Sequence, residues 1–207
     1  MRNPVLVMVL VGLVAAPLSA GPISSTAYGP SLDPVIVRDP GDVAVPFDVT
    51  GIDSMDEYGD ADNVVILFDL AAAVGLPSGS PVTMTGIGWD VTLYAHSPSW
   101  LSELKVYFDD AVAPDGFGLH LTPGAGDSFS GTGSYTSGGL IDLSDNLIAD
   151  IVLPNGILRM EFYEGYDDFE DEWDGIWESG ALTIVATPEP ASLVLLGLGL
   201  VGLVRRR

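Results

Sequence analysis

The side chains with the greatest chemical potential lie in residues 164–178, where eight Asp and Glu residues occur within fifteen positions. So many like charges repel one another in a compact loop unless something neutralises them. Calcium would do so, because it takes roughly six to eight oxygen ligands, including carboxylates and loop carbonyls. The spacing lacks the alternate acids and central glycine of an EF-hand loop. The segment therefore predicts either a solvated acidic loop or a calcium site, for which the best candidate ligands are Asp167, Asp168, Asp171 and Asp174. A second acidic segment, 53–62, is better explained as an exposed linker, although it could supply further ligands.

Tryptophans near these acids suggest a second chemistry, which is carbohydrate binding. Sugar C–H faces pack on aromatic rings, while sugar hydroxyls bond to neighbouring polar groups. Trp89 falls on the apolar side of an expected strand and is predicted to lie in the core, whereas Trp100 follows Ser-Pro-Ser and is freer to face solvent. Trp173 and Trp177 could either pack within the acidic loop or contact a ligand. The candidate ligand-binding residues are therefore Trp100, Trp173 and Trp177.

Catalytic motifs are harder to find. His96 and His120 are the two histidines, and neither lies in a metalloprotease or hydrolase motif. A glycosidase needs two carboxylates at a working separation, and abundant acids do not by themselves indicate such a pair. With no cysteine, disulfides and thiolate chemistry are excluded. We therefore expect a protein that is not an enzyme, with hydrolysis of a matrix polysaccharide as the less favoured alternative.

The elements that would position these residues are predicted to be strands. Residues 87–94, 103–109 and 158–164 alternate apolar and polar side chains with a period of two, which is typical of half-buried strands. In the last of these, Leu158, Met160 and Phe162 form the apolar face. Further strands are expected at 64–70, 118–121, 140–143, 148–152 and 182–186, and one helical turn at 70–74.

Segments rich in Pro and Gly separate these strands, at 77–81, 113–116, 122–127, 131–139 and 154–156. Residues 21–59 predict a loosely ordered entry or edge strands. Frequent turns between seven or eight short strands indicate an all-β fold, a single antiparallel β-sandwich of jelly-roll type. A signal helix at the N-terminal end and a short apolar helix at the C-terminal end are expected to flank it.

The two ends of the chain carry targeting features. Arg2 precedes the apolar run 5–18, and small residues follow at 19–20, which is the plan of a signal peptide over residues 1–20. At the other end, the 14 apolar residues 191–204 would cover about 21 Å as a helix, against roughly 30 Å of bilayer hydrocarbon. This length predicts transient membrane insertion better than a lasting anchor, and the three following arginines would stay on the cytoplasmic side.

The order of motif, apolar run and basic end resembles the PEP-CTERM sorting domain of Gram-negative bacteria. The matching residues are Pro188, Glu189, Pro190 and the cluster Arg205, Arg206 and Arg207, within 188–207. The resemblance implies recognition by an exosortase-type membrane protease, after signal peptidase has acted, and delivery to the cell surface or to an exopolysaccharide matrix. An ordinary tail anchor behind a chance Pro-Glu-Pro is the alternative.

Residues 21–187, the expected domain, hold 28 Asp and Glu against three basic residues. Such a surface repels nucleic acid and attracts cations. From residue 91 to 185 the strand order also resembles the P-domain of proprotein convertases, a galactose-binding-like jelly roll, which favours that topology over an immunoglobulin sandwich. Together these features predict an exported, non-catalytic surface or extracellular-matrix protein, with a carbohydrate-binding module stabilised by calcium as the alternative.

Overall fold

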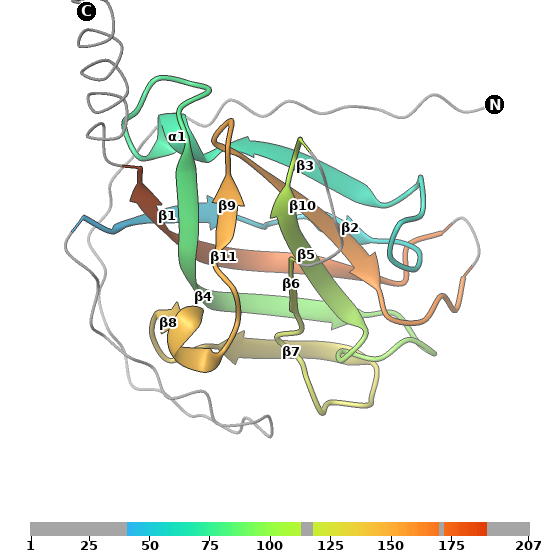
Figure 1. Cartoon of the computed structure of the whole chain (residues 1–207). Coiled ribbons are helices and arrows are strands. Elements are labelled where there is room, and N and C mark those ends of the chain that lie inside the picture. Colours follow the sequence, from blue (N-terminus) through green and yellow to red (C-terminus); the bar gives the residue numbers. More distant parts are fainter. Residues whose placement is uncertain (1–40, 113–117, 170–171, 190–207) are drawn as a thin grey trace, which may run out of the picture.

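Strands dominate the computed structural model, which describes residues 41–112, 118–169 and 172–189 (Figure 1). They form two antiparallel sheets, which confirms the predicted all-β sandwich. The strands are β1 (Val43–Asp48), β2 (Ile52–Ser54), β3 (Val64–Asp69), β4 (Val82–Ala95), β5 (Leu104–Asp110), β6 (Leu119–Leu121), β7 (Gly131–Thr136), β8 (Ile141–Asp142), β9 (Ile151–Leu153), β10 (Ile157–Glu164) and β11 (Gly175–Pro188). Two single turns of helix complete the set, α1 (Leu70–Ala73) and η1 (Ser144–Asn146).

The larger sheet has the order β1-β11-β4-β7, with β2 paired to β11 and both β8 and β9 paired to β4. The smaller sheet has the order β3-β10-β5-β6. Apolar faces of both sheets meet in one core, where Leu93 of β4, Phe108 of β5, Phe162 of β10 and Ile184 of β11 are fully buried. Burial of each such side chain contributes about 1.5–3 kcal/mol. Leu158, Met160 and Phe162 are buried, which confirms the prediction that they form the apolar face of their strand.

Two regions differ from, or refine, the sequence-based expectation. Gly131–Thr136, predicted as a loop, is the edge strand β7, because a strand with one neighbour needs only backbone pairing with β4 and no apolar face. The Thr92 and Ser134 hydroxyls, 3.0 Å apart, add a cross-strand contact.

Within 21–59, β1 is an edge strand, which was one of the two alternatives for that segment. The predicted helical turn after β3 is present, and the Asp69 side chain accepts a hydrogen bond from the Ala72 amide at 2.9 Å.

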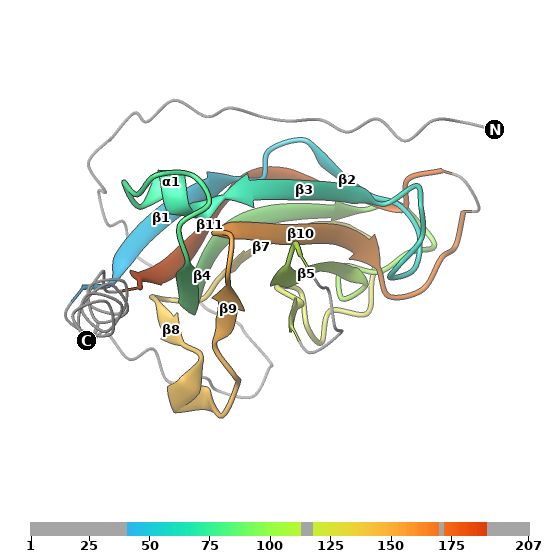
Figure 2. The same cartoon turned by 45° about the horizontal axis from the view of Figure 1, so that its top comes forward.

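Three loops meet at one end of the sandwich. Figures 1 and 2 both place the β2–β3 loop beside the β10–β11 loop, on the right of each view. Glu164 N–H donates to the Asp56 carbonyl at 2.9 Å, and Asp174 N–H donates to the Ser54 carbonyl at 3.0 Å. His96 N–H, in the β4–β5 loop, donates to the Asp174 carbonyl at 2.8 Å. The predicted acidic loop is thus joined by its backbone to segments about 80 to 120 residues earlier.

Candidate cation-binding site

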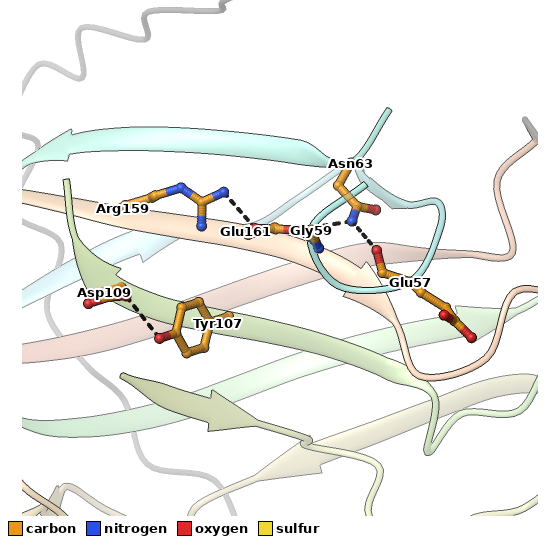
Figure 3. Close-up of polar contacts among 7 residues, drawn as sticks. All are labelled: Glu57, Gly59, Asn63, Tyr107, Asp109, Arg159 and Glu161. Carbon is orange, nitrogen blue, oxygen red and sulfur yellow. Dashed lines mark hydrogen bonds and ion pairs between the residues drawn. The ribbon is translucent and has the colours of Figure 1, made fainter. Parts of the chain in front are cut away.

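Two buried glutamates lie three residues apart on β10, and they have opposite surroundings. The first, Glu161, is a fully satisfied carboxylate (Figure 3). Its Oε1 accepts hydrogen bonds from Gly59 N–H at 2.7 Å and from Asn63 Nδ2 at 3.0 Å. Its Oε2 accepts from Arg159 Nη2 at 2.6 Å, the one ion pair within the described residues. Asn63 also donates to the Glu57 carbonyl and accepts from Asp56 N–H, so this network holds the β2–β3 loop against β10.

Glu164, at the end of the same strand, is 0 % exposed, and neither of its carboxylate oxygens has a hydrogen-bond partner. The pKa of this carboxyl group is raised to about 9, mainly by burial and in smaller part by the nearby charges of Asp174 and Glu103. The Ser54 hydroxyl, which is near enough to oppose the rise but lacks the geometry of a hydrogen bond, and the Lys105 ammonium both lower this pKa. An uncompensated buried carboxylate is costly, so Glu164 is either neutral or bound to something positive.

Asp174 lies beside Glu164 and is also 0 % exposed. Its Oδ2 accepts a hydrogen bond from Asp168 N–H at 3.0 Å, whereas its Oδ1 has no partner. Burial is the main cause that raises the pKa of Asp174, and the charges of Asp167 and Asp168 raise it as well. The Asp168 amide and the Ser99 hydroxyl act in the opposite direction. The two acids therefore share one desolvated, negatively charged environment.

Five residues make up what we name the buried acidic cluster: Ser54, Ser99, Glu164, Asp167 and Asp174. They contribute six of the eight buried side-chain polar atoms that lack a partner among the described residues. All six are oxygens, from three carboxylates and two hydroxyls. Buried polar groups in folded proteins are nearly always paired, so this concentration of unpaired oxygens at one place needs a physical cause. An all-oxygen set of this kind suits a hard cation.

A second acidic group lies in the neighbouring β2–β3 loop. One ligand oxygen from each of Asp56, Asp60 and Asp62 lies within 4.8 Å of the others. Asp60 and Asp62 are exposed, and Asp60 already accepts a hydrogen bond from Asp62 N–H at 2.9 Å. Asp56 and Ser54 are buried and β2 lies in this segment, so residues 53–62 are not simply the exposed linker that the sequence favoured.

Aromatic rings cover the outside of the β10–β11 loop. His96 stacks on Phe169 with ring centroids 5.0 Å apart, and the Trp173 ring lies 5.3 Å from His96 and 6.3 Å from Tyr94. Trp173 is 42 % exposed and Trp100 is 44 % exposed, so both are open to solvent. Trp177 is instead fully buried in β11 and packs edge-on against Phe162, so it belongs to the core and not to the acidic loop. Trp89 is half-buried against the core, as expected.

The predicted calcium ligands are partly brought together. Asp167 and Asp174 belong to the buried acidic cluster, Asp168 contributes its amide to Asp174, and Asp171 lies outside the described residues. The sequence reasoning missed Glu164 and the two serines. Glu164 could have been found from the strand phase, because it follows Leu158, Met160 and Phe162 at intervals of two and so points to the core side. No local signal indicates Ser54 or Ser99, which arrive from other loops.

The end of β11 leads directly into the predicted sorting motif. Pro188 pairs with Val82, and Glu189 follows it, with its side chain accepting a hydrogen bond from the Thr83 hydroxyl at 3.0 Å. The family model described as the PEP-CTERM protein-sorting motif matches residues 186–207. The chain carries a PEP-CTERM sorting signal. A protein with this motif is recognised by an exosortase, a membrane protease, and is exported to the surface or exterior of a Gram-negative cell. Pro190 and Arg205 to Arg207 of the PEP-CTERM motif lie outside the described residues, as does the predicted signal peptide.

Other comparisons add little to the PEP-CTERM match. No curated protein matches the sequence. One solved structure, the virus-like particle of the extra small virus of the giant freshwater prawn Macrobrachium rosenbergii, aligns with 84 % of this chain and 94 % of its own, at 15 % identity. Its TM-score is 0.20, so the likeness carries no argument about topology or function. Among residues 41–112, 118–169 and 172–189, no helix has the length and apolar character needed to cross a membrane; the apolar run 191–204 lies beyond them.

Proposed function

We propose that this protein is a non-catalytic component of the cell surface or of an extracellular, exopolysaccharide-associated matrix. The observation that carries the proposal is the PEP-CTERM motif, which begins on the last strand of the acidic sandwich. The sorting signal accounts for export to the cell surface or matrix, so the β-sandwich is the part of the protein that acts at that location.

The charge of the sandwich supports an extracellular role. Its described part holds two basic side chains, Lys105 and Arg159, and Arg159 is already bound to Glu161. A surface so strongly negative disfavours nucleic acid and resists self-association. It also attracts cations, which are the natural counter-ions of an acidic matrix.

The placement of the acids supports a role without catalysis. A glycosidase needs two carboxyl groups that flank a bound substrate. Glu164 and Asp174, whose pKa values are raised, are both fully buried and are out of reach of a polymer chain. His120 is held by the Tyr163 hydroxyl, 2.7 Å from its Nδ1, and within the described part of the chain no carboxylate forms a hydrogen bond with its ring.

Cell fractionation tests this proposal. The tagged full-length protein should be found in the surface and exopolysaccharide fractions, and the purified protein should leave the host polysaccharide at its original chain length. Recovery in the cytoplasm, or turnover of the polysaccharide that a single carboxylate-to-amide substitution abolishes, would contradict it.

Carbohydrate binding is the second candidate, and the exposed aromatic group of Tyr94, His96, Phe169 and Trp173 favours it. Stacked rings beside acceptor oxygens present both surfaces that a sugar needs. A glycan array should then give hits that Trp173→Ala removes. The matched control is Phe129→Ala, which removes a ring of similar exposure in another loop. An array without hits would rule out the binding module and leave the structural role.

A further inference from the structure

The contrast between Glu161 and Glu164 points to a missing positive partner. Both are buried acids of one strand, yet Glu161 accepts three well-formed hydrogen bonds, whereas Glu164 accepts none and has only the Ser54 hydroxyl nearby. The free basic side chain nearby, Lys105, forms no ion pair with Glu164 in the described structure and lies over the Tyr163 ring, 6.0 Å from its centroid. Its charge lowers the Glu164 pKa only as a minor effect, so among the described residues no basic side chain forms an ion pair with the carboxylate at the end of β10.

We propose that the buried acidic cluster binds a divalent cation of the calcium class, with Glu164 and Asp174 as its central carboxylate ligands. The independent observation is the set of six partnerless buried oxygens, which includes both Glu164 oxygens and the hydroxyls of Ser54 and Ser99. With no His or Cys among them, the donors suit calcium rather than zinc or copper. The site is internal, so it stands apart from the proposed function.

The arrangement also indicates how the ion is held. Opposite ligands of calcium lie at most about 5 Å apart. The carboxylates of Glu164, Asp167 and Asp174 are not among the described groups whose oxygens all lie within 4.8 Å of one another. The proposed site therefore includes a water molecule between the ion and one of the three carboxylates, as calcium sites commonly allow. Asp167, the least buried of the three, is assigned that position.

Such an ion would join three separate segments. Ser54 ends β2, Ser99 lies between β4 and β5, and Asp167 and Asp174 lie between β10 and β11. Two backbone hydrogen bonds already hold these segments together, from Asp174 N–H to Ser54 and from His96 N–H to Asp174. Calcium would add charge neutralisation where the backbone alone leaves the carboxylates uncompensated. The expected consequence is a large effect on stability.

Thermal unfolding of the exported protein, purified as the cells process it, tests the site. Calcium at about one hundred times its Kd should raise Tm by roughly 5–10 °C relative to EDTA. Magnesium at the same concentration should raise it less, because it demands a regular octahedron. A Tm that calcium leaves unchanged would overturn the proposal and would mean that Glu164 is simply a neutral buried acid.

Two variants locate the ion. Glu164→Gln keeps the side chain's shape and should lose the calcium-dependent rise in Tm. Asp60→Asn, in the other acidic group, should keep it. The reverse pattern would place the ion in the β2–β3 loop and overturn the assignment. If Glu164→Gln does not fold, terbium provides a direct readout on the unaltered protein, since Trp173 and Trp177 flank the site in sequence. Saturable emission excited through tryptophan, equivalent to one ion per chain and displaced by calcium, is expected; its absence would refute the site.

Discussion

Replacement of Glu164 by Gln should stabilise the protein when no divalent cation is present. Folding transfers this carboxyl group into the interior, and its pKa rises from about 4.5 to about 9. At pH 7 an unfolded chain carries the charge freely, whereas the folded chain must either take up a proton or bury the charge. The gap between pH 7 and the unfolded pKa is about 2.5 units, which corresponds to about 3 kcal/mol of lost stability. Gln is neutral and similar in shape, so the variant does not lose this free energy.

The sign of the pH dependence follows from the same shift. Because the folded pKa is the higher one, the contribution of Glu164 to stability is complete below pH 4.5 and is lost as the pH rises toward 9. The advantage of Glu164→Gln should therefore be small at pH 4.5 and grow to about 3 kcal/mol at pH 7. Urea denaturation in EDTA at several pH values measures it through the midpoint at constant slope.

The neighbouring glutamate provides a matched control on the same strand. Glu161→Gln removes a carboxylate that already has three donors, and it leaves Arg159 without its partner. Loss of a satisfied buried charge pair destabilises a protein by about 3 kcal/mol or more. The two substitutions are chemically identical and should have opposite signs. A destabilised Glu164→Gln, or an effect independent of pH, would refute the reasoning about its environment.

Three further predictions concern other parts of the fold. Gly180→Ala should lower stability by about 1–3 kcal/mol in urea denaturation, because Gly180 has φ +112° and an added Cβ would lie 2.2 Å from the Asp90 carbonyl oxygen; an unchanged midpoint would contradict this. Leu147→Gly should be neutral or stabilise by up to about 1 kcal/mol, since Leu147 is 97 % exposed at φ 61°; a clear loss would show that its side chain packs. The NMR titration of His120 should have its midpoint below pH 6.5, because burial and the charge of Lys105 lower its pKa more than the charge of Glu161 raises it. A midpoint above 6.5 would contradict this description of its environment.

The sequence predicted the strands whose side chains face a core. Alternation in 87–94, 103–109 and 158–164 identified β4, β5 and β10, because a strand buried on one face must place an apolar residue at every second position. The same rule fails for β7, whose pairing depends on its neighbour β4 and not on its own side chains. Edge strands of small residues therefore resemble loops when only the sequence is read.

The sequence indicated where the candidate site lies, but it did not indicate all of the residues that form it. The acid density of 164–178 indicated where an ion could bind, and Asp167 and Asp174 are members of the buried acidic cluster. Ser54 and Ser99 reach it through tertiary contacts between segments 40 to 120 residues apart, which no local pattern encodes. Trp177 shows the converse: a tryptophan next to acids in the sequence lies in the core, because the chain re-enters the sheet at Gly175.

The most direct test of the account is the surface exposure of the protein on intact cells of its Gram-negative host, measured by antibody labelling or by added protease. The unaltered chain should be labelled, whereas the triple variant Pro188→Ala, Glu189→Gln and Pro190→Ala should be retained in the inner membrane. Thr83→Val is the control, because it removes the contact of Glu189 with the sandwich and leaves the sorting motif intact. Equal surface labelling of the triple variant and the unaltered chain would contradict the account.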